Sequence, residues 1–270
     1  MEAYRQYLQQ EEKSPLTIEK YLRDVGKFLD WLGERPLNKA NTLAYKVMLA
    51  EEYAVSSVNS MLSALNSWLA YMGRTDCRVK FIRQQRQMFS AEERELTKAE
   101  YERLLCAARS KPRLYLLIQT ICATGIRVSE HRFITVEAAR RGAAQVRLKG
   151  KVRTVFLPRD LCRSLLRYAK EHQIRSGPVF VTASGRPMDR SSIWAEMKKL
   201  CAAARVAREK VFPHNLRHLF ARTFYTMEKD IVRLADLLGH SSINTTRIYT
   251  MESGLTHRRQ IEKMRLCHIM

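Results

Sequence analysis

The residues of this chain that could do chemistry together lie in three short stretches of its second half. They are Arg127 and Glu130 in A-T-G-I-R-V-S-E, His214 and Arg217 in H-N-L-R-H, and His240 and Tyr249 in L-G-H-S-S-I-N-T-T-R-I-Y. A single histidine or tyrosine most often serves structure. Two arginines, two histidines and a late tyrosine, however, are the groups needed to break and remake a phosphodiester through a covalent tyrosine link.

Metal chemistry fits the same residues poorly. His214 and His218 are four apart, like metal ligands on a helix, but the glutamate of an H-E-x-x-H motif and a third ligand are both missing. The six cysteines, at positions 77, 106, 122, 162, 201 and 267, form no C-x-x-C pair. The sequence therefore predicts no metal site and no cofactor.

The charge of the chain predicts a polyanionic partner. Lysine and arginine total 48 against 27 aspartates and glutamates, which gives +21 and an isoelectric point near 10.0. Residues 1–90 hold 13 basic and 10 acidic residues (+3), whereas residues 91–270 hold 35 and 17 (+18). The second part therefore carries most of the positive field. On charge alone, a ribosomal or chromatin-like protein stays open.

No segment indicates a membrane span or export. No run approaches the ~18–20 uninterrupted apolar residues that a membrane helix requires. The first residues, M-E-A-Y-R-Q-Y, lack the basic-then-apolar pattern of a signal peptide. Scattered cysteines fit reduced thiols, so we expect a cytoplasmic protein without a membrane partner.

Residues 1–85 predict about four helices in a compact bundle. Ser14-Pro15 is typical of a helix start, and apolar residues then recur at helical spacing: Ile18, Tyr21, Leu22, Val25, Phe28, Leu29 and Leu32. A second stripe is made of Val58, Met61, Leu62, Leu65, Leu69 and Met72. Weaker helical segments precede the two stripes, at 4–10 and 42–51.

The polar stretch 86–95 predicts a linker, and residues 96–270 a second domain that opens with a Thr97–Glu100 capping box. An apolar run at 114–123 stops at Thr124-Gly125. Helices are expected at 159–171, 191–204, 214–227, 231–238 and 243–249. A hairpin is expected from strands 144–148 and 153–157 around Lys149-Gly150-Lys151, with a third strand at 179–181. The fold class is therefore mainly α with a small β-sheet: an all-α first domain and an α+β second domain.

The helix expected at 214–227 has two distinguishable faces. Its apolar stripe is Leu216, Leu219, Phe220, Thr223, Phe224 and Met227. His214 and Arg217 lie roughly 100° or more from that stripe and therefore share a face that is not the core. An ordinary surface pair and a functional pair are both open on this helix alone.

The ordered motifs resemble those of the tyrosine recombinases, the phage integrase and Xer group. The resemblance rests on A-T-G-I-R-V-S-E, K-G-K-V-R-T-V, H-N-L-R-H and L-G-H-S-S-I-N-T-T-R-I-Y in this order. It covers the whole chain, because S-P-L-T-I-E-K-Y resembles the family's helical core-binding (SAM-like) domain and L-T-K-A-E-Y-E-R-L-L resembles the start of its catalytic domain.

The resemblance implies a role for each matching residue. Arg127 and Arg217 would clamp the phosphate, whose extra negative charge in the transition state suits two planar guanidinium groups. Tyr249 would be the nucleophile, with His214 and His240 as its hydrogen-bonding and proton-handling partners. Glu130 would support an arginine or a histidine. His131 stands where the family usually has an apolar residue, which bears on local packing.

A general acid is also needed for the departing 5′-oxygen, and the hairpin turn would supply it. Lys149 matches the family's turn lysine best, and Lys151, two residues on, is the alternative. Simple contact with the DNA backbone is open for both.

We therefore expect a site-specific recombinase that cleaves double-stranded DNA through a 3′-phosphotyrosine, as a dimer on each site and a tetramer at synapsis. The tail 251–270 would dock on a neighbouring protomer or on its own DNA, with apolar contacts from Leu255, Ile261, Met264 and Leu266.

A type I B topoisomerase-like enzyme is the alternative, against which the helical first domain and turn lysine argue. A non-catalytic DNA-binding regulator is another, against which the filled catalytic positions argue.

Overall fold

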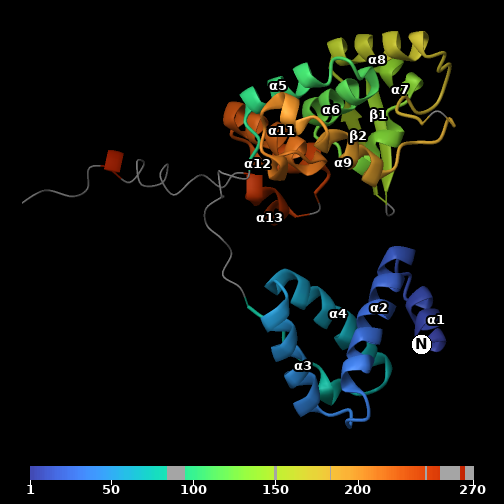
Figure 1. The fold of residues 1–270 in the computed structure, drawn as a ribbon, viewed down its shortest axis with the longest axis vertical. Helices are drawn as coiled ribbons and strands as arrows, with labels where there is room; N and C mark the ends of the chain where they lie inside the picture. The colour runs from blue at the N-terminus through green and yellow to red at the C-terminus, as the bar shows by residue number, and fades with distance from the viewer. Residues whose placement is uncertain (84–94, 149–150, 183, 241, 250–261, 265–270) are drawn as a thin grey trace, which may run out of the picture. The chain divides into compact units, whose positions relative to one another are not determined.

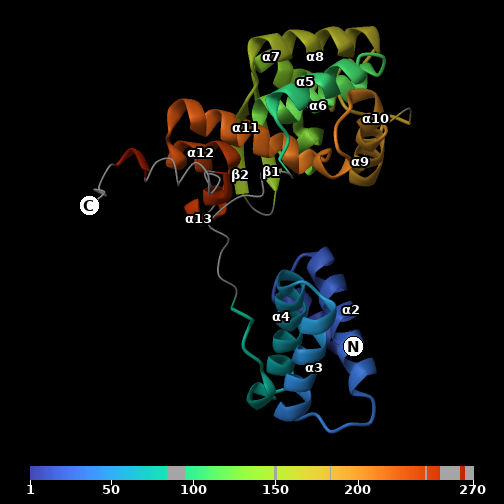
Figure 2. The same cartoon turned by 60° about the vertical axis from the view of Figure 1, so that its left-hand side comes forward.

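The computed structural model describes residues 1–83, 95–148, 151–182, 184–240, 242–249 and 262–264. The chain divides into two compact units, Met1–Arg86 and Gln87–Met270, drawn from blue to teal and from green to red in Figures 1 and 2. Of the expected linker 86–95, only Glu95 lies within the described residues. Helices dominate and the sheet is small, so the expected fold class is confirmed. Among the described residues, no helix is both long and apolar enough to cross a membrane.

The first unit is a helical bundle. Its helices are α1 (Glu2–Gln10), α2 (Pro15–Leu32), α3 (Lys39–Glu52) and α4 (Val55–Tyr71), followed by the 3-10 turn η1 (Thr75–Cys77). The Ser14 hydroxyl accepts a hydrogen bond from the Thr17 amide at 3.3 Å, and Pro15 takes the first helical position, as predicted. Both predicted stripes supply the core, where α2 packs on α4. Met72 is the exception: it is 50% exposed because α4 ends one residue earlier.

The second unit is built around one apolar helix. Its elements up to the hairpin are α5 (Lys98–Ala107), α6 (Pro112–Thr124), the 3-10 turn η3 (Val128–Phe133), α7 (Val136–Arg141), β1 (Ala143–Leu148) and β2 (Lys151–Phe156). The predicted capping box of α5 is confirmed, with Thr97 and Glu100 bonding each other's backbone amides. Helix α6 is buried on several sides because α5, α8, α9 and α11 all contact it.

The remaining elements complete the unit, and three of them, α8, α9 and α11, pack on α6. They are α8 (Arg159–Glu171), α9 (Arg190–Lys198), α10 (Cys201–Ala204), the 3-10 turn η4 (Arg208–Lys210), α11 (Pro213–Glu228), α12 (Ile231–Leu238), α13 (Ile243–Thr246) and the 3-10 turn η5 (Arg247–Tyr249). Figure 1 shows α7 and α8 next to one end of the hairpin and α11 to α13 grouped together. The hairpin is antiparallel, with Ala144 opposite Val155 and Leu148 opposite Lys151.

Two expectations about elements are wrong, and two elements were not expected. The strand expected at 179–181 is not formed, and of these residues only Val181 makes an isolated bridge, with Pro187, while Pro178 bridges Thr135. Neither proline has an N–H to extend a ladder. The helix expected at 191–204 is broken, because the amide of Leu200 bonds Met197 in a tighter turn that brings Leu200 into the core. The helix α7 and the turn η3 were not predicted.

Candidate active site

The motif residues come together near the N-terminus of α11, although they are far apart in sequence. Arg127 lies three residues after the end of α6, His214 and Arg217 lie in the first turns of α11, His240 follows α12, and Tyr249 ends η5. The ring centroids of His214 and Tyr249 are 6.5 Å apart, and those of His240 and Tyr249 are 5.9 Å apart. Arg127 is near enough to lower the pKa of Arg217 by its charge. One site therefore contains both arginines, both histidines and the tyrosine.

Arg217 is a buried residue and not half of a surface pair. Its side chain is 1% exposed, so the prediction that this face of α11 lies outside the core is wrong for Arg217. Helix α11 is covered by α6 and also by α12 and η5, and two of its faces are therefore buried. The end of the predicted apolar stripe fails for the converse reason: Met227 is 74% exposed, beyond the reach of these neighbours.

Hydrogen bonds to three acceptors of the protein fix the orientation of the Arg217 guanidinium. Nη1 donates to the carbonyl of Gly125, and Nη2 donates to the carbonyl of Leu238 at 2.8 Å and to Nε2 of His240 at 2.9 Å. Burial, and then the charge of Arg127, lower its pKa to about 10. Arg217 therefore stays protonated at neutral pH, and two like charges are placed together where an anion would relieve their repulsion.

The conformation and contacts of Gly125 explain why the motif has glycine two residues before Arg127. It ends α6 in a left-handed conformation with φ +64°, and a Cβ there would lie 2.4 Å from the ring of Phe220. The same residue presents its carbonyl to Arg217. The T-G step thus turns the chain toward Arg127 and helps to orient the second arginine.

His240 is neutral, and both of its ring nitrogens are engaged. Nε2 accepts from Arg217, so Nδ1 carries the proton and donates to the Thr246 hydroxyl at 2.8 Å, a tautomer assigned from this network. Burial, and then the charges of Arg217 and Arg127, lower the pKa of His240 to about 4. His240 therefore fixes the guanidinium of Arg217 and has no free nitrogen for a second partner.

Tyr249 is 3% exposed and lies among three histidine rings. His240 stacks on it at 15°, and His218 meets it edge-on with centroids 4.5 Å apart. The Tyr249 side chain is close enough to Arg217 to raise the pKa of the guanidinium, against the larger lowering by burial and by Arg127. His214 keeps an exposed edge. The protein atoms around the rest of the ring still remove part of its hydration, and this, followed by the charges of Arg217 and Arg127, lowers the pKa of His214.

His218 was considered from the sequence only as a metal ligand, and its contact with Tyr249 was missed. Burial, followed by the charge of neighbouring His214, lowers its pKa to about 4. Its Nδ1 is buried with no hydrogen-bond partner among the described residues. Helical spacing could have indicated this position, since residues 214 and 218 share a face of α11. Among the described residues, no three His, Cys, Asp or Glu side chains are grouped to hold a metal ion.

Glu130 pairs with Arg127. The carboxylate is 1% exposed; Oε1 accepts from Nη1 of Arg127 at 3.0 Å, and Oε2 accepts from the Arg127 amide at 2.8 Å. Oε2 also accepts from Arg153, a residue that the sequence analysis missed. The sequence feature that could have indicated Arg153 is its position in the strand. It lies two residues before buried Val155 and therefore on the same, inward face.

The comparisons with known proteins agree with this geometry. The sequence matches the phage integrase family over residues 94–254 and the phage integrase N-terminal SAM-like domain over residues 1–75. A tyrosine recombinase XerA of Thermococcus kodakarensis is 30% identical over 279 residues, covering 98% of this chain and 95% of the relative. The chain belongs to the phage integrase family. It is a tyrosine-type site-specific DNA recombinase.

Other relatives and solved structures share the recombinase's length and fold. A tyrosine recombinase XerD of Vibrio cholerae is 28% identical, covering 87% of this chain and 85% of the relative. A crystal structure of XerA recombinase is 26% identical with a TM-score of 0.55, covering 97% and 96% of the two chains. A lambda integrase dimer bound to a core site has a TM-score of 0.73 at 18% identity, covering 94% of each chain, and shows a common fold.

The lysine expected to act in the recombinase is not placed by the structure. Lys149 lies outside the described residues, and Lys151 is the first residue of β2, opposite Leu148. His131 is buried at 4% exposure, with Nδ1 bonded to the carbonyl of Val128. Burial lowers the pKa of His131, so a neutral ring fills the space where an apolar side chain was expected. Of the four tail contacts, only Met264 is described, and it is 60% exposed.

Proposed function

We propose that this recombinase cleaves and rejoins double-stranded DNA in the cytoplasm through a 3′-phosphotyrosine at Tyr249. The observation that carries the proposal is a buried tyrosine whose ring stacks on His240, while His240 itself bonds the buried, protonated guanidinium of Arg217. A phosphodiester that reaches Arg217 and Arg127 would replace the repulsion between them with charge-assisted hydrogen bonds. The nucleophile would then already lie beside the phosphate.

In the cleavage step, Oη of Tyr249 forms a bond to phosphorus while the bond from phosphorus to the 5′-oxygen breaks. Exposed, neutral His214 takes the tyrosine proton, because both nitrogens of His240 are engaged. Lys149 gives a proton to the departing 5′-oxygen. The link to Tyr249 conserves the phosphodiester energy, so attack by a 5′-hydroxyl of another strand reseals the DNA without a cofactor.

Self-association completes the proposed function. Solved relatives include a lambda integrase dimer bound to a core site and a lambda integrase tetramer bound to a Holliday junction. Their likeness supports a dimer of this chain on each site and a tetramer at synapsis. The tail 251–270 would link the protomers.

The covalent link can be tested with a duplex selected by the protein from a random pool and nicked near the cleavage position, so that the released 5′-hydroxyl fragment diffuses away. Wild-type protein should give an adduct that survives denaturation. Tyr249→Phe should bind with unchanged affinity and give no adduct, because the ring remains but the nucleophilic oxygen is gone.

Tyr225→Phe is the matched control, since Tyr225 packs against the same small cluster as Tyr249. It should give the adduct at wild-type yield. An adduct of normal yield from Tyr249→Phe would place the nucleophile elsewhere.

A further inference from the structure

We propose that Arg153 is a positioning residue that holds Arg127 and the end of α12 in their catalytic places, an inference that rests on the proposed function. Arg153 lies on the inward side of β2, and its side chain is only 13% exposed. Nη2 donates to Oε2 of Glu130, and Nη1 donates to the carbonyl of Leu237. One guanidinium thus joins η3, β2 and α12.

Each of the two acceptors of Arg153 is connected to a proposed catalytic residue, Glu130 by a hydrogen bond and Leu237 through its neighbour in the chain. The other oxygen of Glu130 accepts from Arg127 at 3.0 Å. Leu237 is followed by Leu238, whose carbonyl accepts from Arg217, and then by Gly239 and His240. Two successive carbonyls at the C-terminal end of α12 therefore receive Arg153 and Arg217, where the helix dipole favours positive charge.

The glycine before His240 makes room for this arginine. A Cβ at Gly239 would lie 2.3 Å from Cδ of Arg153 and 2.9 Å from its Nε. Gly239 also has φ +64°, as required at the end of α12. The glycine of L-G-H thus ends the helix and also lets Arg153 pass close to the backbone.

Loss of Arg153 would act on chemistry through Glu130. The Glu130 carboxylate is 1% exposed and shared between two arginines. Without Arg153, Oε2 would keep only the Arg127 amide as a donor. The Arg127 guanidinium could then bond both oxygens and would be drawn toward the protein and away from the phosphate. The carbonyl of Leu237 would lose its partner at the same time, which loosens the segment leading to His240.

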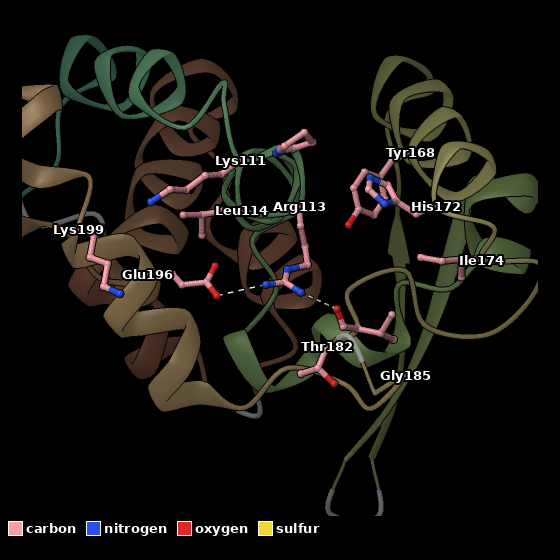
Figure 3. Close-up of a pocket in the computed structure, with 12 residues that line it drawn as sticks. Lys111, Arg113, Leu114, Tyr168, His172, Ile174, Thr182, Gly185, Glu196 and Lys199 are labelled. Atoms are coloured by element: carbon pink, nitrogen blue, oxygen red, sulfur yellow. Dashed lines mark hydrogen bonds and ion pairs between the residues drawn. The ribbon is translucent and has the colours of Figure 1, made fainter.

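Arg113 offers a matched control in the same unit. Its Nη1 donates to the carbonyl of Val181 at 2.9 Å and its Nη2 pairs with Glu196 at 3.3 Å, so it also joins one carbonyl and one carboxylate. Figure 3 shows Arg113 directed at Glu196. Both side chains line a pocket of about 770 Å³ whose lining residues include none of the motif residues. Arg113→Met therefore removes a comparable pair of interactions outside the site.

The first experiment measures single-turnover cleavage and affinity on the selected duplex for Arg153→Met and Arg113→Met. Cleavage by Arg153→Met should fall about 10- to 100-fold, because a displacement near 1 Å can cost 10²-fold. Its affinity for the duplex should stay within about 2-fold, since Arg153 faces the protein. Arg113→Met should cleave at close to the wild-type rate. Equal cleavage by the two variants would overturn the inference.

A second substrate separates positioning from a general loss of structure. Replacing one non-bridging oxygen of the scissile phosphate with a methyl group removes the charge that Arg127 is proposed to neutralise. The defects of Arg127→Ala and Arg153→Met relative to wild type should both shrink on this methylphosphonate. If Arg127→Ala recovers and Arg153→Met does not, Arg153 has no role in positioning Arg127. If Arg127→Ala is not slow on normal DNA, the proposed clamp itself is wrong.

Should Arg153→Met not fold, Arg153→Lys carries the test. It keeps the charge but has no planar fork to reach Glu130 and Leu237 together. Cleavage should be slower than wild type on normal DNA and should recover on the methylphosphonate. Wild-type speed on normal DNA would overturn the inference.

Discussion

His240 and His218 are kept neutral by burial and by the positive charges around them. Each has its pKa lowered to about 4, whereas the unfolded chain binds these protons near the ordinary histidine value of about 6.5. Between these values the unfolded state binds more protons than the folded state. Their contribution to stability is therefore fully present above about pH 6.5 and is lost as the pH falls toward 4.

Urea unfolding at neutral pH and near pH 5 checks this prediction. The free energy of unfolding of wild type should fall between the two conditions. His218→Phe should reduce that fall, because it keeps a ring against Tyr249 and removes one titrating group. His172→Phe, a change at an exposed histidine that also packs on a tyrosine, is the control and should leave the wild-type fall in place. An unchanged fall in His218→Phe would contradict the assignment.

Helix α12 illustrates how the end of one element can set the geometry of a site. Gly239→Ala and Gly142→Ala both place a side chain at a left-handed helix end, with φ +64° and +73°, which costs ~1–3 kcal/mol of stability. Only at position 239 would the new Cβ meet Arg153. Both variants should melt at lower temperature, but only Gly239→Ala should also slow cleavage of the selected duplex. Equal cleavage rates would show that Arg153 tolerates the displacement.

The proposed general acid, Lys149, directly follows β1 in the sequence. Lys149→Ala should slow cleavage by about 10²–10⁴ on normal DNA, because the 5′-oxygen then leaves without a proton. With sulfur in place of that bridging oxygen, a far better leaving group, the variant should cleave at close to the wild-type rate. Arg127→Ala should gain much less from the sulfur, since its lost function is charge stabilisation. Rescue of Lys151→Ala instead would assign the acid to Lys151.

At the scale of the whole molecule, most of the net positive charge and all of the proposed catalytic residues lie in the second unit. Residues 91–270 carry +18 and residues 1–90 carry +3, so most phosphate contacts are expected in the catalytic unit. The affinity of fragment 91–270 for non-specific duplex should fall log-linearly with salt, with a slope of about 0.9 per phosphate contacted. That slope should account for most of the slope of the full chain. A steeper slope for residues 1–90 alone would contradict this distribution.

Patterns in the sequence were sufficient wherever the physical cause is local. The Ser14 cap, the Thr97–Glu100 capping box and the bounds of α8 follow from residues within a few positions of one another, because capping and helical periodicity act over that distance. The motif order likewise indicated the family and the residues that meet at the site. Their types alone restricted the chemistry to phosphodiester transfer by a tyrosine.

Only the tertiary structure decided which surfaces are covered and which donors are already engaged. Arg217 lies off the apolar stripe of α11, yet it is buried because α12 and η5 cover that second face. Arg153 acquires its significance from Glu130 and Leu237, which are 23 and 84 positions away in sequence. Such contacts depend on how whole elements pack. Periodicity reports the preference of each residue for burial and cannot report which distant carbonyl or carboxylate will meet it there.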